Sequence, residues 1–259
     1  MQRTKTYFIS DVHLGLPNHN LSLEREQKLV TWLDSIKEET QALYLLGDIF
    51  DFWYEYKYVV PKGYVRFMAK IAEFTDQGIP VYFFTGNHDV WAFDYFEQEL
   101  GMTIIRHATT VQISGKKFHL AHGDGLGPAD VGFKLLKWLF TNKFAQFMFS
   151  RIHPNFALWM GNSWSRKKRY SEKIDNLQFE GLEKEWLIAY AKDILTKEPI
   201  DYFLFGHRHI AVNLMIDKAQ FINLGDWIHN FTYSVFDGKK LSLKRLNGET
   251  IPIMTSSVG

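Results

Sequence analysis

The stretch DYFLFGHRHI, residues 201–210, joins a short apolar run to a glycine and two histidines that are separated by one residue. An apolar run of this length, rich in aromatic residues and closed by a glycine, is typical of a buried β-strand. One histidine after such a strand is ordinary. His207 and His209 together raise the question of whether other residues with ligand chemistry follow strands elsewhere in the chain.

Five further apolar runs end in the same way, each at a polar group. They are TYFIS before Asp11, ALYLLG before Asp48, VYFFTG before Asn87, KFHLAHG around His122 and AQFINLG before Asp226. Apolar residues at helical spacing lie between several of them and predict helices over 21–39, 63–78 and 178–198. Residues 231–246 predict an antiparallel hairpin that turns at Asp237-Gly238. Strands that alternate with helices indicate βαβ units and a layered α/β fold.

Composition sets limits on location and partners. The chain has 259 residues, of which 46% are hydrophobic and 23% charged, and its formal net charge of +1 does not require an acidic or nucleic-acid partner. It has no cysteine, which excludes disulfides and thiolate metal sites. No run reaches the roughly 18 apolar residues of a membrane-spanning helix. The N-terminal stretch MQRTKTYFIS is too polar for a signal peptide, so we expect a cytoplasmic protein.

One region interrupts the alternation of strands and helices. Residues 126–175 are rich in large apolar side chains and hold nine Lys and Arg against three acidic residues. Their spacing predicts two or more helices. We therefore expect a basic helical lid, 126–175, inserted into a single domain that spans 1–259.

The candidate ligands share one position, directly after a predicted strand. They are Asp11, His13, Asp48, Asn87, His122, His207 and His209. Loops beyond the carboxyl ends of strands in α/β sheets converge on one crevice, so these residues should become neighbours. Seven groups are too many for one small cation, and a carboxylate can bridge two. We expect two divalent cations about 3.5–4 Å apart, the usual arrangement for phosphoryl hydrolysis. The mixed nitrogen and oxygen set suits Mn²⁺, with Fe, Zn²⁺ and Mg²⁺ as alternatives, better than Ca²⁺.

Each fragment also has a plainer interpretation. A single G-D or G-N-H-D could be a turn, because Gly, Asn and Asp dominate turns. Histidines outside these fragments are expected to be ordinary hydrogen-bonded residues: His19, His107, His119, His153 and His229. The metal interpretation is favoured because the five fragments occur in order, each after a strand.

In this order the fragments resemble the calcineurin-like metallophosphoesterases, whose pattern is D-x-H, G-D, G-N-H-D/E, H-G and G-H-x-H. The matching residues are Asp11-Val12-His13, Gly47-Asp48, Gly86-Asn87-His88-Asp89, His122-Gly123 and Gly206-His207-Arg208-His209. The resemblance spans nearly the whole chain outside the insertion. It implies a sandwich of two mixed β-sheets flanked by helices. It also implies that Asp11, His13, Asp48 and His209 hold one metal, and Asp48, Asn87, His122 and His207 the other.

Within the family, the chain is similar to the pyrophosphatases of lipid A synthesis that convert UDP-2,3-diacylglucosamine to UMP and 2,3-diacylglucosamine 1-phosphate. The similar segments are ALYLLGDIFDFW, HGDGLGPADVGFK and INLGDWI. The chain departs from the best-known branch at His88, where that branch has arginine. We expect His88 to stabilise charge on the reacting phosphate or to protonate the leaving oxygen, and Asp89 to orient its ring.

In proteins of this family, lids similar to residues 126–175 hold the sugar phosphate with an Asn-Ser pair and nearby basic residues. The expected substrate-binding set is Asn87, His88, Asp130, Asn162, Ser163, Arg166, Lys167 and His207. Apolar lid residues such as Phe144 and Phe147 would suit acyl chains, or shallow contact with an anionic inner-membrane surface. The competing interpretation of RKKR, residues 166–169, is a solvated helix face.

Other functions stay open on this evidence. The same metals would serve a phosphodiesterase or phosphatase acting on another nucleotide or a phospholipid, a phosphoprotein phosphatase, or a nuclease with a basic groove. A non-catalytic interaction scaffold is the alternative from a different class, although such proteins typically lose ligands and every ligand is intact here. We expect neither a nucleic-acid nor a protein partner.

Overall fold

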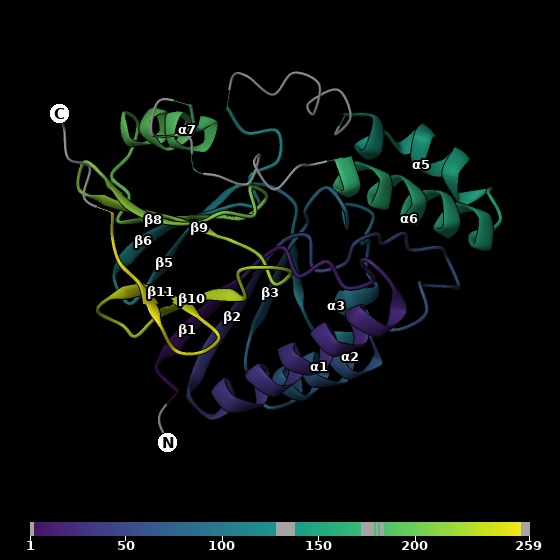
Figure 1. Cartoon of the computed structure of the whole chain (residues 1–259), viewed down its shortest axis with the longest axis horizontal. Helices are drawn as coiled ribbons and strands as arrows, with labels where there is room; N and C mark the ends of the chain where they lie inside the picture. The colour runs from purple at the N-terminus through teal and green to yellow at the C-terminus, as the bar shows by residue number, and fades with distance from the viewer. Residues whose placement is uncertain (1–2, 128–137, 172–178, 180, 182–183, 255–259) are drawn as a thin grey trace.

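Two mixed β-sheets packed face to face form the centre of the molecule (Figure 1). The computed structural model describes residues 3–127, 138–171, 179, 181 and 184–254, without the side chains of 162, 164 and 166–171. The seven-stranded sheet has the order β12-β11-β10-β1-β2-β3-β4, and the five-stranded sheet the order β5-β6-β7-β9-β8. Their strands are β1 (Lys5–Ile9), β2 (Thr40–Leu46), β3 (Val81–Phe84), β4 (Thr103–Ile105), β5 (Thr109–Ile113), β6 (Lys116–Leu120), β7 (Tyr202–Phe205), β8 (Ala211–Ile216), β9 (Ala219–Leu224), β10 (Thr232–Phe236), β11 (Leu241–Arg245) and β12 (Thr250–Ile251).

Helices cover the outer face of each sheet, as Figure 1 shows. Helices α1 (His19–Ile36), α2 (Val65–Asp76) and α3 (Tyr95–Leu100) pack on the seven-stranded sheet, and a 3₁₀ turn, η1 (Lys37–Glu39), follows α1. Helix α7 (Trp186–Leu195) packs on the five-stranded sheet. The expected sandwich of two mixed sheets flanked by helices is confirmed.

The layering explains why the central strands are almost continuously apolar. Successive side chains of a strand point to opposite faces, and both faces are buried here. On β1, Tyr7 and Ile9 pack toward helices α1 and α2, whereas Phe8 lies between the two sheets. There the Phe8 ring stacks 5.8 Å from the ring of Phe118, on a strand of the other sheet. The strands that carry the candidate ligands are therefore held rigidly.

Two helices of the 126–175 region dock beside the carboxyl ends of the strands. They are α5 (Lys143–Ser150) and α6 (Pro154–Ser171), which confirms the helical prediction for the described part of the insertion. Aromatic side chains of the body donate hydrogen bonds to carbonyls of this region: Tyr54 to Gln146 at 2.9 Å and Trp91 to Phe140 at 2.8 Å. Large apolar side chains of α5 and α6 are exposed, with Phe144 72% and Trp159 62% exposed.

The hairpin expected over 231–246 is present, whereas the helix expected over 178–198 differs from the prediction. The hairpin of β10 and β11 is confirmed, and the Asp237 carboxylate accepts hydrogen bonds from the backbone of Lys239 and Lys240 in its turn. The helix expected over 178–198 is shorter, because α7 begins only at Trp186 after the extended residue Glu185. Among the described residues, no helix combines the length and apolar character needed to cross a bilayer.

Candidate metal centre

The seven predicted ligands lie on loops that leave the carboxyl ends of β1, β2, β3, β6 and β7. Backbone hydrogen bonds tie these loops to one another. Asp11 N donates to Gly47 O at 3.1 Å, and His13 N donates to Asp48 O at 3.0 Å. Gly206 N donates to His122 O at 2.8 Å. Strands far apart in sequence, from both sheets, thus present their ligands at one place.

The predicted ligand atoms form two groups, and the Asp48 carboxylate of one group lies near a histidine of the other. Potential ligand atoms of Asp11, His13 and His209 lie within 4.8 Å of one another, as do those of Asp48, His122 and His207. Asp48 Oδ2 lies 3.7 Å from His13 Nε2 and 3.2 Å from His122 Nε2, and so stands between the groups. This is the arrangement expected for two cations bridged by one carboxylate.

The backbone at this centre is strained. Five of the seven predicted ligands have a positive φ, in the left-handed region that costs a residue with a side chain about 1–2 kcal/mol. They are Asp11, His13, Asp48, His207 and His209. Strain of this kind persists where surrounding structure imposes it, and it clusters at functional sites.

Three buried ligand atoms have no hydrogen-bond partner in the structure: Asp11 Oδ1, Asn87 Oδ1 and His122 Nε2. The last of these is close to Asp48 Oδ2 without forming a hydrogen bond with it. Leaving a buried polar atom unpaired is costly, and such atoms in native structures commonly face an ion or water. All three belong to the predicted ligand set. The two oxygens offer lone pairs, and His122 Nε2 offers one when its proton is released on metal binding, so the residues fit divalent cations.

Electrostatics also favours positive charge at this centre. Burial alone would lower the pKa of His122, but the Asp48 carboxylate outweighs it and raises that pKa to about 10. Burial alone would raise the pKa of Asp48, but His122 and His88 hold it well below its usual range. The centre therefore keeps Asp48 ionised and attracts cations.

Outer partners orient the ligand histidines. His122 Nδ1 donates to the Leu46 carbonyl at 2.8 Å. His13 Nδ1 lies 3.3 Å from Asp51 Oδ1, and His209 Nδ1 lies 3.3 Å from Asp226 Oδ2. Such contacts fix the ring and leave Nε2 to face a metal. Sequence reasoning missed Asp51 and Asp226 as members of the site, although both lie in segments, GDIFD and NLGD, that follow strands.

Comparison with known proteins also supports a phosphoesterase metal centre. Residues 4–211 match the sequence profile of the calcineurin-like phosphoesterases. The chain belongs to this family. Metal-dependent hydrolysis of phosphoesters or pyrophosphates, the reaction class expected from the sequence, is thereby confirmed.

Relatives match this calcineurin-like phosphoesterase over most of its length. A UDP-2,3-diacylglucosamine hydrolase of Porphyromonas gingivalis is 40% identical over 94% of this chain and 98% of its own. A protein of the same name from Vibrio parahaemolyticus is 27% identical over 86% of this chain and 90% of its own. The solved structure of Yfce, a phosphoesterase from E. coli, has 16% identity and a TM-score of 0.49, over 96% of this chain and 97% of that one.

In this phosphoesterase, His88 lies at the centre but Asp89 does not orient its ring as predicted. His88 Nε2 is 4.0 Å from Asp48 Oδ2, and Nδ1 donates to the Asp51 carbonyl at 2.6 Å. The Asp89 carboxylate is buried and instead accepts from the backbone of Gly86 at 2.7 Å and Ile49 at 2.8 Å. Burial, aided by the charge of Asp48, raises the pKa of Asp89 to about 7. Asp89 therefore joins the β2 and β3 loops, and the contact to His88 Nδ1 that was predicted for Asp89 is made by the Asp51 carbonyl.

The predicted substrate contacts in the lid are only partly described. Asp130 and the side chains of Asn162, Arg166 and Lys167 lie outside the described residues. Ser163 is exposed on α6. Ser165, two residues further on, is buried against the centre and was not predicted.

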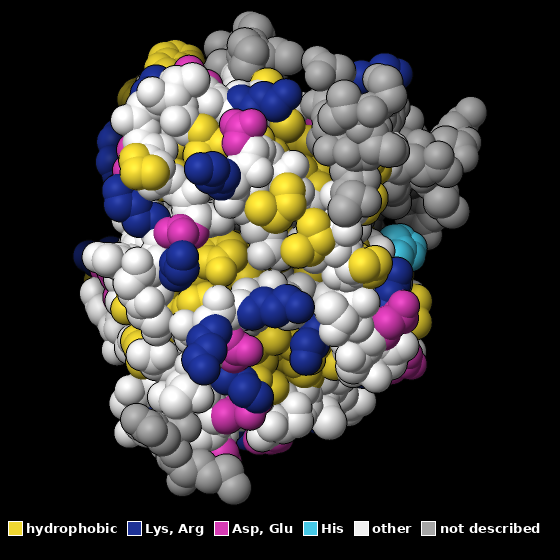
Figure 2. Space-filling view, turned by 90° about the vertical axis from the view of Figure 1, so that its left-hand side faces the viewer, with side chains coloured by type: hydrophobic (Ala, Val, Ile, Leu, Met, Phe, Trp, Pro, Cys, Tyr) yellow, Lys and Arg dark blue, Asp and Glu magenta, His cyan; other side chains and the backbone are white. Residues whose placement is uncertain are grey.

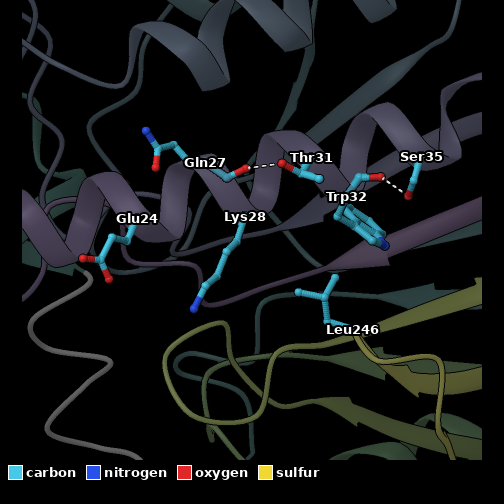
Figure 3. A pocket seen from close by; sticks show the side chains of 7 residues that line it. All are labelled: Glu24, Gln27, Lys28, Thr31, Trp32, Ser35 and Leu246. Atoms are coloured by element: carbon cyan, nitrogen blue, oxygen red, sulfur yellow. Dashed lines mark hydrogen bonds between the residues drawn. The ribbon is translucent and has the colours of Figure 1, made fainter.

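Several hollows are lined by described residues of the phosphoesterase, and two of them differ in their relation to the centre. One, of about 450 Å³, borders the centre at Gly86 and Asp124 and includes Arg106 and Lys143. The other, of about 500 Å³, lies between α1 and Leu246, toward which Lys28 and Trp32 extend (Figure 3). Neither hollow is lined by a predicted ligand, and the second also lacks a residue next to one, so it plays no part in the proposed chemistry.

Proposed function

We propose that this chain hydrolyses the pyrophosphate of UDP-2,3-diacylglucosamine to UMP and 2,3-diacylglucosamine 1-phosphate, a step of lipid A synthesis. The observation that carries the proposal is the 40% identity to a hydrolase named for this substrate, over nearly the full length of both chains. Because 94% of this chain is covered, the similarity is not confined to the metal fragments shared by the whole family.

The proposed ligand sets are those implied by the sequence. Asp11, His13, Asp48 and His209 would hold one cation, and Asp48, Asn87, His122 and His207 the other, with Mn²⁺ as the proposed ion. When bound, two divalent cations neutralise charge on phosphoryl oxygens and lower the pKa of water. The grouping of ligand atoms within 4.8 Å and the unpaired Asn87 oxygen support these assignments.

His88 is proposed to act on the phosphate itself. Its Nδ1 hydrogen is taken by the Asp51 carbonyl, so only Nε2 is left to face the substrate. A protonated Nε2 would donate to a phosphoryl oxygen or to the leaving oxygen. The ring is partly exposed, 14% for its side chain, whereas the Asp48 side chain is 2% exposed, and so His88 is open to substrate.

The two halves of the substrate need different surroundings. The proposed lid, residues 126–175, offers exposed Phe144, Phe147 and Trp159 for acyl chains. The hollow beside Gly86 is lined in part by Arg106 and Lys143, which suit the phosphate of the nucleotide half. The reacting pyrophosphate would then lie between them, at the centre.

The same lid supports a location on the cytoplasmic face of the inner membrane. Phe156 and Met148 are more than half exposed, Lys143 is the first residue of α5, and Arg151 directly follows that helix. Helices with apolar and basic faces bind anionic bilayer surfaces without crossing them. Figure 2 shows the side of the molecule away from these helices, where Lys and Arg lie near Asp and Glu with hydrophobic side chains between them.

The test is direct. Purified protein is incubated with Mn²⁺ and UDP-2,3-diacylglucosamine, with bis(p-nitrophenyl) phosphate as a second substrate. We expect UMP and the lipid 1-phosphate, and we expect His88→Ala to reduce turnover strongly while metal content stays normal. Activity on the small diester alone would reject the lipid substrate and keep the reaction class. Loss of metal from His88→Ala would reject the role of His88.

A further inference from the structure

Helix α6 of the lid packs unusually close to the body through a line of small residues. Ala157, Gly161 and Ser165 follow each other at intervals of four, so they lie on one face of the helix. Ala157 and Ser165 are buried. A methyl group on Gly161 would lie 2.4 Å from the ring of Phe52, too close for any larger residue without movement of that ring. This face brings Ser165 directly to the metal centre.

Ser165 hydrogen-bonds the residue that positions two histidines. Its hydroxyl donates to Asp51 Oδ1 at 2.8 Å, across 114 residues of sequence. The same carboxylate oxygen lies 3.3 Å from His13 Nδ1, and the Asp51 carbonyl accepts from His88 Nδ1 at 2.6 Å. Ser165 Oγ itself lies 3.4 Å from His88 Nδ1. One residue, Asp51, therefore receives contacts from the lid and from both rings.

We propose that Ser165 is a positioning residue for hydrolysis: it holds Asp51, and through Asp51 it fixes the rings of His13 and His88. The inference rests on the proposed roles of those two histidines. It adds that the lid does more than bind substrate, because α6 supplies a hydroxyl without which the centre is incompletely oriented. Small misplacements of positioned groups reduce turnover about 100-fold in severe cases, and partners of ligand histidines are typically worth about 10–100-fold.

A purely packing role for Ser165 makes different predictions from a positioning role. If Ser165 only fills space at the interface, its replacement changes stability and substrate affinity. If it acts through Asp51, its replacement changes turnover and metal affinity, even with a small substrate that has no acyl chain to bind. The loss should also disappear when Asp51 is already altered, because residues that act as one unit are not additive.

The experiment uses the full chain loaded with Mn²⁺ and the substrate bis(p-nitrophenyl) phosphate. The variants are Ser165→Ala, Ser165→Thr, which keeps the hydroxyl, Asp51→Asn, and the double variant Ser165→Ala with Asp51→Asn. The control is Asn155→Ala, an exposed position on the same helix. Measurements are kcat, KM, thermal unfolding, Mn²⁺ affinity of the metal-free chain by calorimetry, and ¹⁵N shifts of the histidine rings.

We expect Ser165→Ala to lower kcat about 10-fold with an unchanged KM, to weaken Mn²⁺ binding several-fold and to shift two ring Nδ1 resonances. Ser165→Thr should recover most of the turnover, Asn155→Ala should match the wild type, and the double variant should lose no more than Asp51→Asn. Wild-type kcat and Mn²⁺ affinity in Ser165→Ala would overturn the inference, as would equal losses in the alanine and threonine variants or additive losses in the double variant. An inactive His88→Ala beside a fully active Ser165→Ala would reject this inference alone, whereas an active His88→Ala would reject the proposed function of His88.

Discussion

Replacing Gly86 with alanine is expected to destroy the metal centre while the fold survives. Gly86 opens the G-N-H-D fragment after β3 and passes directly over Asp48. An added methyl group would lie 2.2 Å from Asp48 Oδ1 and 2.7 Å from Asp48 N. Ordinary van der Waals contact begins at 3.4 Å, so the carboxylate would have to retreat by about 1.2 Å.

That displacement is large on the scale of metal coordination. Ligand distances are held within about 0.2 Å, so a shift roughly six times greater removes Asp48 as a ligand. Because Asp48 Oδ2 stands between His13 and His122, both cations should be affected. Loss of an outer partner costs about 10–100-fold in metal affinity. Loss of Asp48, a direct ligand shared by both cations, should cost more than loss of an outer partner. We expect Mn²⁺ affinity to fall by more than about 100-fold and kcat/KM to fall in parallel.

The assay compares Mn²⁺ titration by calorimetry, metal content after gel filtration, and hydrolysis of bis(p-nitrophenyl) phosphate. Gly238→Ala is the matched control, because its φ of +91° makes alanine strained there, yet an added methyl would meet nothing within 4 Å. It should lose some stability and keep both metals. A Gly86→Ala variant that binds two Mn²⁺ ions with wild-type affinity would refute the reasoning.

Three further perturbations test separate parts of the structure. Asp226→Asn removes the charged partner of His209 Nδ1 and should weaken Mn²⁺ binding about 10–100-fold, measured by the same titration; no change would mean that the ring is oriented otherwise. Phe144→Asp with Phe147→Asp should raise KM for the diacylated substrate and spare the small diester, whereas equal damage to both substrates would indicate misfolding. Burial lowers the pKa of His119 below its ordinary value of about 6.5, so the unfolded chain binds a proton more readily and stability falls as pH drops below that value. Urea unfolding at pH 7.5 and 5.5 should therefore show a smaller pH difference in His119→Asn than in the wild type.

The position of a strand in its sheet explains whether it could be predicted from the sequence. The six strands foreseen from apolar runs and the two of the hairpin occupy interior positions, where two paired neighbours and two covered faces favour continuous apolar sequence. The unforeseen strands, β4, β5, β8 and β12, are the four sheet edges. Edge strands are short or partly exposed, as in TTVQI of β5, and so the pattern in their sequence is weak.

Site residues placed by the strands could also be predicted, whereas contacts that depend on distant parts of the chain could not. The clustering of the predicted ligands could be foreseen because each follows a strand, and the fold brings such positions together. The contacts of Asp51 and Ser165 could not, because 114 residues separate them and their meeting depends on how α6 docks. Asp89 was misassigned for the same reason: adjacency to His88 in sequence suggested contact, whereas the chain direction turns its carboxylate toward the backbone of Ile49.

The choice of ligand residues and the strain at the centre have a common cause. Loops that must bring donors from five strands within a few ångströms force tight backbone turns, and Asp and His are among the residues that tolerate positive φ best after glycine and asparagine. The neighbouring glycine Gly206 leaves room for a ligand side chain, since a methyl group there would lie 2.4 Å from Asp11 Oδ2. Hydrogen bonds between loops, such as His207 N to Asp11 Oδ2 at 2.8 Å, offset part of the strain. The unpaired buried atoms and the ionised Asp48 would each gain a partner when cations bind, so we expect metal binding to stabilise the folded chain.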